Sequence, residues 1–78
     1  MITLLGNLVE HSIFTLNVVK YKVSTRIREP KKNLNSRHTF LEEYTDNTIV
    51  IECYPFLGGQ WQIHLSVFVN EKQEVEIQ

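Results

Sequence analysis

The chain has 78 residues, 42% of them hydrophobic and 22% charged, and a formal net charge of −1. This length fits a single domain, residues 1–78, and the composition excludes a disordered tail, because disordered segments are poor in apolar residues and rich in net charge. The single cysteine, Cys53, excludes an internal disulfide and leads us to expect a cytoplasmic location. All apolar runs are far shorter than the ~20 residues that cross a bilayer, so we expect no membrane span.

Charge is divided unevenly along the chain. Residues 1–40 carry seven Lys or Arg against two Glu, a net +5, whereas residues 41–78 carry one Lys against seven Asp or Glu, a net −6. An asymmetry of this kind indicates charged contact surfaces for partners and says little about the fold.

In chain order, the first expected element is Ile2–Val9, a strand interrupted at Gly6. Within it, Leu4-Leu5-Gly6-Asn7-Leu8 resembles the start of bacterial single-stranded DNA-binding proteins of OB-fold type, where a leucine-rich strand runs into Gly-Asn-Leu. The resemblance covers five residues and implies an OB-like barrel. Nothing downstream reproduces that family's aromatic platform or its helix between the third and fourth strands, so the chain is not assigned to the family.

The clearest pattern lies in residues 18–29, where apolar and polar side chains alternate with the period of a strand. One face is expected to pack on the core through Val19, Tyr21, Val23, Thr25 and Ile27, and the other to face solvent through Lys20, Lys22, Ser24, Arg26 and Arg28. Just before this segment, Phe14 and Leu16 fall on even positions. This change of phase near Asn17 predicts a β-bulge or bend that divides a long strand into two arms.

A polar, cationic loop is expected at residues 30–35, and the segment after it is ambiguous. Residues 37–45 form either a strand, paired with the next strand through an Asp46-Asn47 turn, or a short helix over residues 36–45 capped by Ser36. Basic residues would crowd the N-terminal end of that helix and Glu42 and Glu43 its C-terminal end. Both placements oppose the helix dipole, so the strand is favoured.

Residues 48–54 are apolar at nearly every position, which is typical of a central strand covered on both faces. Residues 60–69 alternate again, so we expect a second long strand whose core face carries Trp61, Ile63, Leu65, Val67 and Val69. A two-residue Gly58-Gly59 turn would place Cys53 opposite His64. A loop of three or five residues places Cys53 opposite Ile63 and Ile51 opposite Leu65, and this apolar matching favours the longer loop.

A short last strand is expected at residues 74–77, with Val75 and Ile77 facing inward. The sum is five or six short strands in near-sequential order. This predicts an all-β fold, a small antiparallel meander curled into a barrel or strongly twisted sheet. The alternative is an α+β fold with one short helix near residues 36–45.

Side chains that carry catalytic or metal chemistry do not converge in this sequence. Cys53 lies in the most apolar strand, where a thiol is an inert core residue. The three histidines and Cys53 do not stand at metal-ligand spacings, and Glu42 and Glu43 are adjacent, so in a strand they point to opposite faces. We therefore expect neither an enzyme nor a metal site, and no cofactor.

The strongest functional pattern is a basic face that could neutralise phosphates along a strand. Its members are Lys20, Lys22, Arg26, Arg28, Lys31, Lys32 and Arg37. Proteins that bind single strands also need aromatic side chains beside the cations, and Tyr21 and Trp61 are both assigned above to the core. This assignment weighs against nucleic acid as the ligand.

Two functions are therefore carried forward. The favoured one is a small non-catalytic protein-interaction module of inhibitor, immunity or adaptor type, with contact residues Glu42, Glu43, Phe56 and Leu57. The alternative is a single-stranded nucleic-acid-binding, OB-like small β-barrel that uses the basic face. A homodimer formed by edge-strand pairing is compatible with either.

Overall fold

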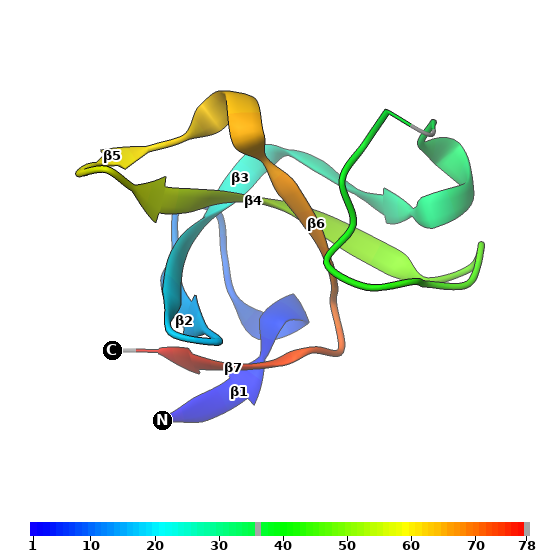
Figure 1. The fold of residues 1–78 in the computed structure, drawn as a ribbon. Helices are drawn as coiled ribbons and strands as arrows, with labels where there is room; N and C mark the ends of the chain where they lie inside the picture. The colour runs from blue at the N-terminus through cyan, green and yellow to red at the C-terminus, as the bar shows by residue number, and fades with distance from the viewer. Residues whose placement is uncertain (36, 78) are drawn as a thin grey trace.

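The computed structural model describes residues 1–35 and 37–77. Within these residues the fold is all-β, a strongly twisted, mostly antiparallel, seven-stranded sheet that curls around a core without closing (Figure 1). The strands are β1 (Ile2–Leu4), β2 (Ile13–Leu16), β3 (Val19–Pro30), β4 (Ile49–Leu57), β5 (Gln60–Trp61), β6 (Val67–Asn70) and β7 (Glu74–Ile77). Three short 3₁₀ turns accompany them, η1 (Leu5–Asn7), η2 (Lys31–Asn33) and η3 (Ile63–Leu65). The predicted fold class is confirmed, in its form of a twisted sheet.

The strand order is β1-β7-β2-β3-β4-β5, and β6 also pairs with β4. Consecutive strands from β2 to β4 are neighbours, as expected for a meander, and the last strand returns beside β2. The two ends of the chain therefore lie together in β1 and β7 (Figure 1). No helix in the described part of the chain is long and apolar enough to cross a membrane.

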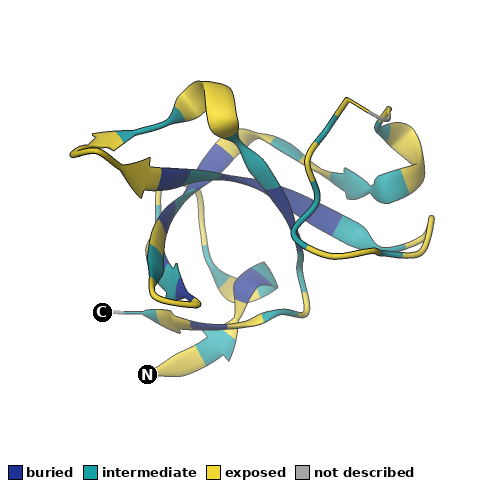
Figure 2. Ribbon diagram, in the orientation of Figure 1, coloured by how far each residue is buried: buried dark blue, intermediate teal, exposed yellow. Residues whose placement is uncertain are grey.

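The core fills the concave side of the sheet, where alternate residues of β2, β3 and β4 point inward. Phe14 and Tyr21 are cross-strand partners whose rings stack at 5.4 Å. Cys53 is fully buried in the middle of β4, which confirms it as a core residue, and much of β4 is dark blue in Figure 2. Burial raises the pKa of its thiol to about 12, so the sulfur stays protonated.

The change of phase near Asn17 marks a tight hairpin, and the prediction of a bulge or bend there is wrong. Leu16 of β2 pairs with Val19 of β3, which leaves a two-residue turn of Asn17 and Val18. Both turn residues have positive φ, 51° and 62°, the signature of a type I′ turn. A two-residue turn changes the inward-facing residues from even to odd positions, and so does a bulge, so the periodicity of the sequence alone does not distinguish the two.

The hairpin after β4 does use the two-residue Gly58-Gly59 turn, and the predicted longer loop is wrong. Leu57 pairs with Gln60 and Phe56 with Trp61, and both glycines have positive φ. The pairing then stops at η3, so the predicted strand over residues 60–69 is two short strands. After this interruption β6 rejoins β4 with Cys53 opposite Val67, which keeps the apolar matching through a different register.

The end of the chain matches the prediction and its start does so in part. In β7, Val75 is buried and Ile77 packs on the core, as expected. The predicted strand over residues 2–9 shortens to β1, because η1 begins at Leu5. The 3₁₀ turn η2 likewise occupies part of the predicted loop at residues 30–35.

The ambiguous segment at residues 37–45 is neither a strand nor a helix, so both predictions are wrong; Ser36, the predicted cap, lies outside the described residues. The segment is extended and irregular, with one isolated parallel bridge between Phe40 and Phe68 of β6. Phe40 covers the outer face of the sheet, where its ring lies 5.8 Å from that of the buried Phe68, and Leu41 packs against the core. Packing against a second face holds this segment without the ladder of hydrogen bonds that a strand requires.

Candidate functional site

The site begins with an irregularity in β3 that the alternating sequence hides. Val23 lies opposite Cys53 but Arg28 lies opposite Ile51, so residues 24–27 all face the single residue Glu52 of β4. Ser24 stays on the outer face, beside Glu52 and Tyr54, as its position in the alternation predicts, but it is buried there although the alternation predicts exposure. Residues beyond the bulge therefore take a different phase from those before it.

A buried polar cluster fixes the bulge. The Ser24 hydroxyl donates to the buried carboxylate of Glu52 at 2.7 Å and accepts from the backbone N–H of Arg26 at 3.0 Å. The Tyr54 hydroxyl lies 2.9 Å from Ser24 Oγ and 3.4 Å from Glu52 Oε1, and it donates in these contacts because the single hydrogen of Ser24 goes to Glu52. These hydrogen bonds offset the cost of burying a carboxylate in the sheet.

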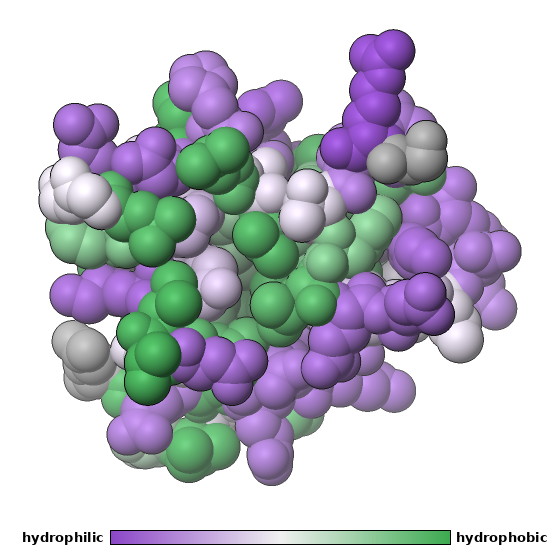
Figure 3. Space-filling model, viewed as in Figure 1, coloured by the Kyte–Doolittle hydropathy of each residue, from purple (hydrophilic) through white to green (hydrophobic). Residues whose placement is uncertain are grey.

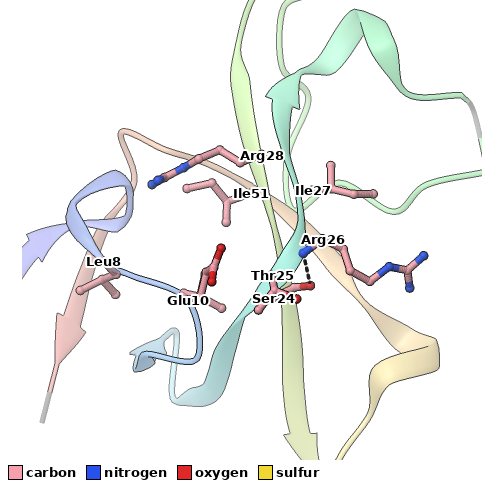
Figure 4. A pocket seen from close by; sticks show the side chains of 9 residues that line it. Leu8, Glu10, Ser24, Thr25, Arg26, Ile27, Arg28 and Ile51 are labelled. Carbon is pink, nitrogen blue, oxygen red and sulfur yellow. Dashed lines mark hydrogen bonds between the residues drawn. The ribbon is translucent and has the colours of Figure 1, made fainter.

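The bulge divides the predicted basic face. Arg28 and Arg26 leave β3 in opposite directions (Figure 4). Arg28 reaches the N-terminal loop, where its guanidinium donates to the Gly6 carbonyl at 2.7 Å, and it lines a cavity of about 270 Å³ together with Leu8 and Glu10. Lys20 and Lys22, before the bulge, lie on the outer face of the sheet, since Tyr21 and Val23 point into the core.

Two aromatic rings lie beside these two lysines. The Lys20 ammonium is 5.5 Å from the centroid of the Phe56 ring, and the Lys22 ammonium is 4.6 Å from that of the Trp61 ring. Phe56 and Trp61 are paired across β4 and β5 and meet edge to face at 4.9 Å. We call these four residues, Lys20, Lys22, Phe56 and Trp61, the lysine–aromatic face.

Trp61 was predicted to be a core residue, and this is wrong. The two-residue Gly58-Gly59 turn pairs Trp61 with Phe56, whose side chain lies on the outer face, and η3 then ends the pairing, so the residues from Trp61 to Leu65 do not enter the core. Trp61 is half-buried against Phe56, and Leu57, Ile63 and Leu65 are 46%, 55% and 58% exposed. Figure 3 accordingly shows apolar side chains, in green, exposed at the surface over β5 and η3. This tip of the molecule combines aromatic, aliphatic and cationic groups.

The remaining basic residues of the prediction lie beyond the bulge, around η2 and the irregular segment. Lys31 donates to the Tyr44 carbonyl at 2.9 Å and lies 5.3 Å from the centroid of the Phe40 ring. Lys32 and Arg37 are exposed. The acidic pair Glu42 and Glu43 is also exposed, on the same irregular segment, and does not join Phe56 and Leu57 in one element.

Groups suited to bond-making chemistry are few. Cys53 is inaccessible and Ser24 is buried with its hydroxyl committed to Glu52. Nowhere in residues 1–35 and 37–77 do three His, Cys, Asp or Glu side chains come together in a way that could hold a metal ion.

Sequence reasoning found the lysines of this site, named Phe56 only as a contact for a protein partner, and missed Trp61. The signal that was available is the Gly58-Gly59 pair, since two adjacent glycines favour a two-residue turn, and this turn sets Trp61 beside Phe56. Comparisons with protein-family models, with curated proteins and with solved structures gave no match for this chain, so the site is interpreted from its own geometry.

Proposed function

We propose that the protein binds single-stranded nucleic acid on the lysine–aromatic face. The observation that carries the proposal is the pairing of each lysine with an aromatic ring on three adjacent strands, Lys20 with Phe56 and Lys22 with Trp61. Proteins that bind single strands combine aromatic rings, on which bases stack, with cations that contact the backbone phosphates. Both kinds of group lie here on one outer surface of a sheet whose other surface is the core.

Binding exchanges one partner of each lysine for another. Without a ligand, the Lys22 ammonium covers the Trp61 ring at 4.6 Å. A base that stacks on the ring displaces the ammonium, which then lies within reach of the phosphate of the same nucleotide. Each stacked base contributes about 1–3 kcal/mol, and each neutralised phosphate releases counterions and makes the affinity depend on salt.

Trp61 is the chain's single tryptophan, so its fluorescence reports on the site without a label. We expect an oligothymidylate to quench it, with an affinity that falls log-linearly between about 50 and 200 mM salt. Trp61→Ala, followed by anisotropy of a labelled oligonucleotide, should weaken binding by about 5- to 150-fold, the equivalent of one stacked base. Circular dichroism of each variant separates loss of binding from loss of fold.

The charge contribution is tested with a double variant and a matched control. Lys20→Gln with Lys22→Gln removes two phosphate contacts and should lower the salt slope by about 1.4, at ~0.7 for each single-strand phosphate. Lys72→Gln, an exposed lysine in the turn between β6 and β7, should leave the slope unchanged. Equal slopes for the wild type and the double variant, or an unquenched Trp61 at saturation, would contradict the proposal.

A protein-interaction module of inhibitor, immunity or adaptor type is the second candidate, and the exposure of Leu57, Ile63 and Leu65 favours it. Apolar side chains gathered on a monomer surface mark binding sites for other proteins. Ile63→Ser with Leu65→Ser should then abolish capture of a partner from a nuclease-treated lysate while binding of oligothymidylate persists. If the wild type and the double variant capture the same proteins in the same amounts, this candidate is contradicted. A homodimer through the outer edge of β1 would appear as a doubled mass in solution.

A further inference from the structure

Two adjoining cavities on the outer face of the molecule share one histidine. The first, about 310 Å³, has Arg37, His38 and His64 among its lining residues. The second, about 400 Å³, is lined in part by His38 together with Lys31 and Lys32. We call these five residues, Lys31, Lys32, Arg37, His38 and His64, the basic groove. One carboxylate, that of Asp46, lines the second cavity.

The groove lies where the irregular segment crosses the sheet. Phe68 of β6 donates its N–H to the Thr39 carbonyl at 2.8 Å, and its own carbonyl accepts from the N–H of Leu41 at 3.0 Å. These two bonds hold the segment beside β6. The His38 ring then meets the Phe68 ring edge to face at 5.0 Å, and Phe68 is buried. His38 is thus placed by the packed part of the fold.

The turn η3 connects the basic groove to the lysine–aromatic face. His64 lies on η3, three residues after Trp61, and it lines the groove. Three residues span at most about 10 Å of chain, the length of no more than about three stacked nucleotides at 3.4 Å each. A strand that stacks on Trp61 and follows η3 therefore arrives at His38 and Arg37.

The groove has the donors that phosphate oxygens require. Arg37 carries a guanidinium that can bind a phosphate through two parallel N–H groups. The Nδ1 atom of His38 lies 3.2 Å from the Asn35 carbonyl, and because a carbonyl only accepts, Nδ1 carries the hydrogen. The Nε2 atom is then an acceptor in the neutral ring and a donor in the protonated ring.

We propose that the basic groove is a second, phosphate-binding subsite for the strand held on the lysine–aromatic face. The ligand is then a single strand of up to about seven nucleotides: two stacked on Phe56 and Trp61, no more than about three along η3 and two in the groove. The groove offers this strand the cations Lys31, Lys32 and Arg37, and among the described residues Asp46 is the carboxylate that lines it. The inference rests on the proposed function.

The test compares oligothymidylates of three and eight nucleotides. In the wild type, the eight-nucleotide strand should bind at least about tenfold more tightly than the shorter one, the equivalent of one charge-assisted hydrogen bond. Lys32→Gln with Arg37→Gln, both at exposed positions, should abolish most of this ratio, yet retain quenching of Trp61. Lys72→Gln, at an exposed lysine outside the groove, is the matched control and should keep the wild-type ratio.

Tripolyphosphate, which has no base to stack, separates the two proposals. It should shift the C2-proton NMR signals of His38 and His64 and leave Trp61 emission unchanged. If it does so while no oligonucleotide binds, the proposed function is wrong and the phosphate subsite stands. If both oligonucleotides quench Trp61 with equal affinity, or the double variant keeps the wild-type ratio, the subsite is overturned and the proposed function stands. A protein that binds neither probe overturns both.

Discussion

The turn between β2 and β3 should be improved by a single substitution, Val18→Gly. Val18 has a φ of 62° and is 98% exposed, so its side chain contributes almost no packing while its backbone lies in the left-handed region. A β-branched residue there is crowded against its own carbonyl, at a cost of roughly 1–2 kcal/mol. Glycine adopts this conformation without that cost, and Asn-Gly is the preferred sequence for a type I′ turn.

The expected gain is smaller than the strain relieved, because glycine also makes the unfolded chain more flexible by about 0.5–1 kcal/mol. The net increase in unfolding free energy should be about 0.5–1 kcal/mol, which for a domain of this size raises the melting temperature by about 2–8 °C. Thermal melts followed by circular dichroism measure this shift directly.

The control for this substitution is Val9→Gly, at another exposed valine that lies outside the positive-φ residues. At that position glycine relieves no strain and only makes the unfolded chain more flexible, so the variant should be less stable by about 0.5–1 kcal/mol. Opposite signs for the two variants support the argument from backbone strain. A Val18→Gly variant that melts at or below the wild type would refute it.

Three other variants probe the cluster at the bulge, the core and the second hairpin. Ser24→Ala should cost about 1–3 kcal/mol, since it leaves the buried Glu52 carboxylate without its closest donor, whereas Ser12→Ala should change stability by less than about 0.5 kcal/mol in the same urea titrations. The pKa of the Cys53 thiol is 9.0 in the unfolded chain and about 12 in the folded protein, so between these two pH values only the unfolded state ionises. Stability should therefore fall with rising pH, by up to about 1.4 kcal/mol per unit, and urea titrations of Cys53→Ala across that range should lack this contribution. Gly59→Ala, at a φ of 77° with open space around the new methyl group, should lower the melting temperature by about 4–8 °C and weaken binding of oligothymidylate, measured by anisotropy.

The sequence predicted those parts of the fold in which one physical effect dominates. The alternation through Tyr21 and Val23 and the continuous apolar run through Ile51 and Cys53 reflect burial alone, and both strands formed as expected. Burial also gives the inward phase of Val75 in the last strand. In each case a period of two, or its absence, is enough to fix both the element and its face.

Predictions failed where two effects compete. For the second hairpin, apolar matching of Cys53 with Ile63 was weighed against a tight turn at Gly58-Gly59, as if one register had to serve the whole strand. The protein satisfies both: the glycines turn in two residues and η3 then resets the register before β6. A short interruption of this kind leaves no mark in a pattern of alternating residues, because Ile63 and Leu65 look like core residues whether or not they reach the core.

The candidate site was predictable only in part for the same reason. Lys20 and Lys22 were correctly placed on an exposed face of β3 because the alternation before the bulge is undisturbed. The cations after the bulge do not lie on that face. The extra residues opposite Glu52 change the face to which the following side chains of β3 point, and Arg28 therefore binds the Gly6 carbonyl. The bulge itself could not be foreseen, because it depends on a contact between Ser24 and Glu52 that are 28 residues apart.

The two interruptions, the bulge in β3 and the turn η3, account together for the arrangement of the proposed binding surface. A regular β3 would have carried one unbroken row of cations, and a regular strand after Trp61, which the Gly58-Gly59 turn pairs with Phe56, would have kept His64 in the sheet. Because the bulge sends Arg28 away, Lys20 and Lys22 are left facing the aromatic pair of β4 and β5. Because η3 leaves the sheet, His64 lines the cavity that holds His38. Restoring either regular strand should therefore reduce binding without removing a single charged or aromatic residue.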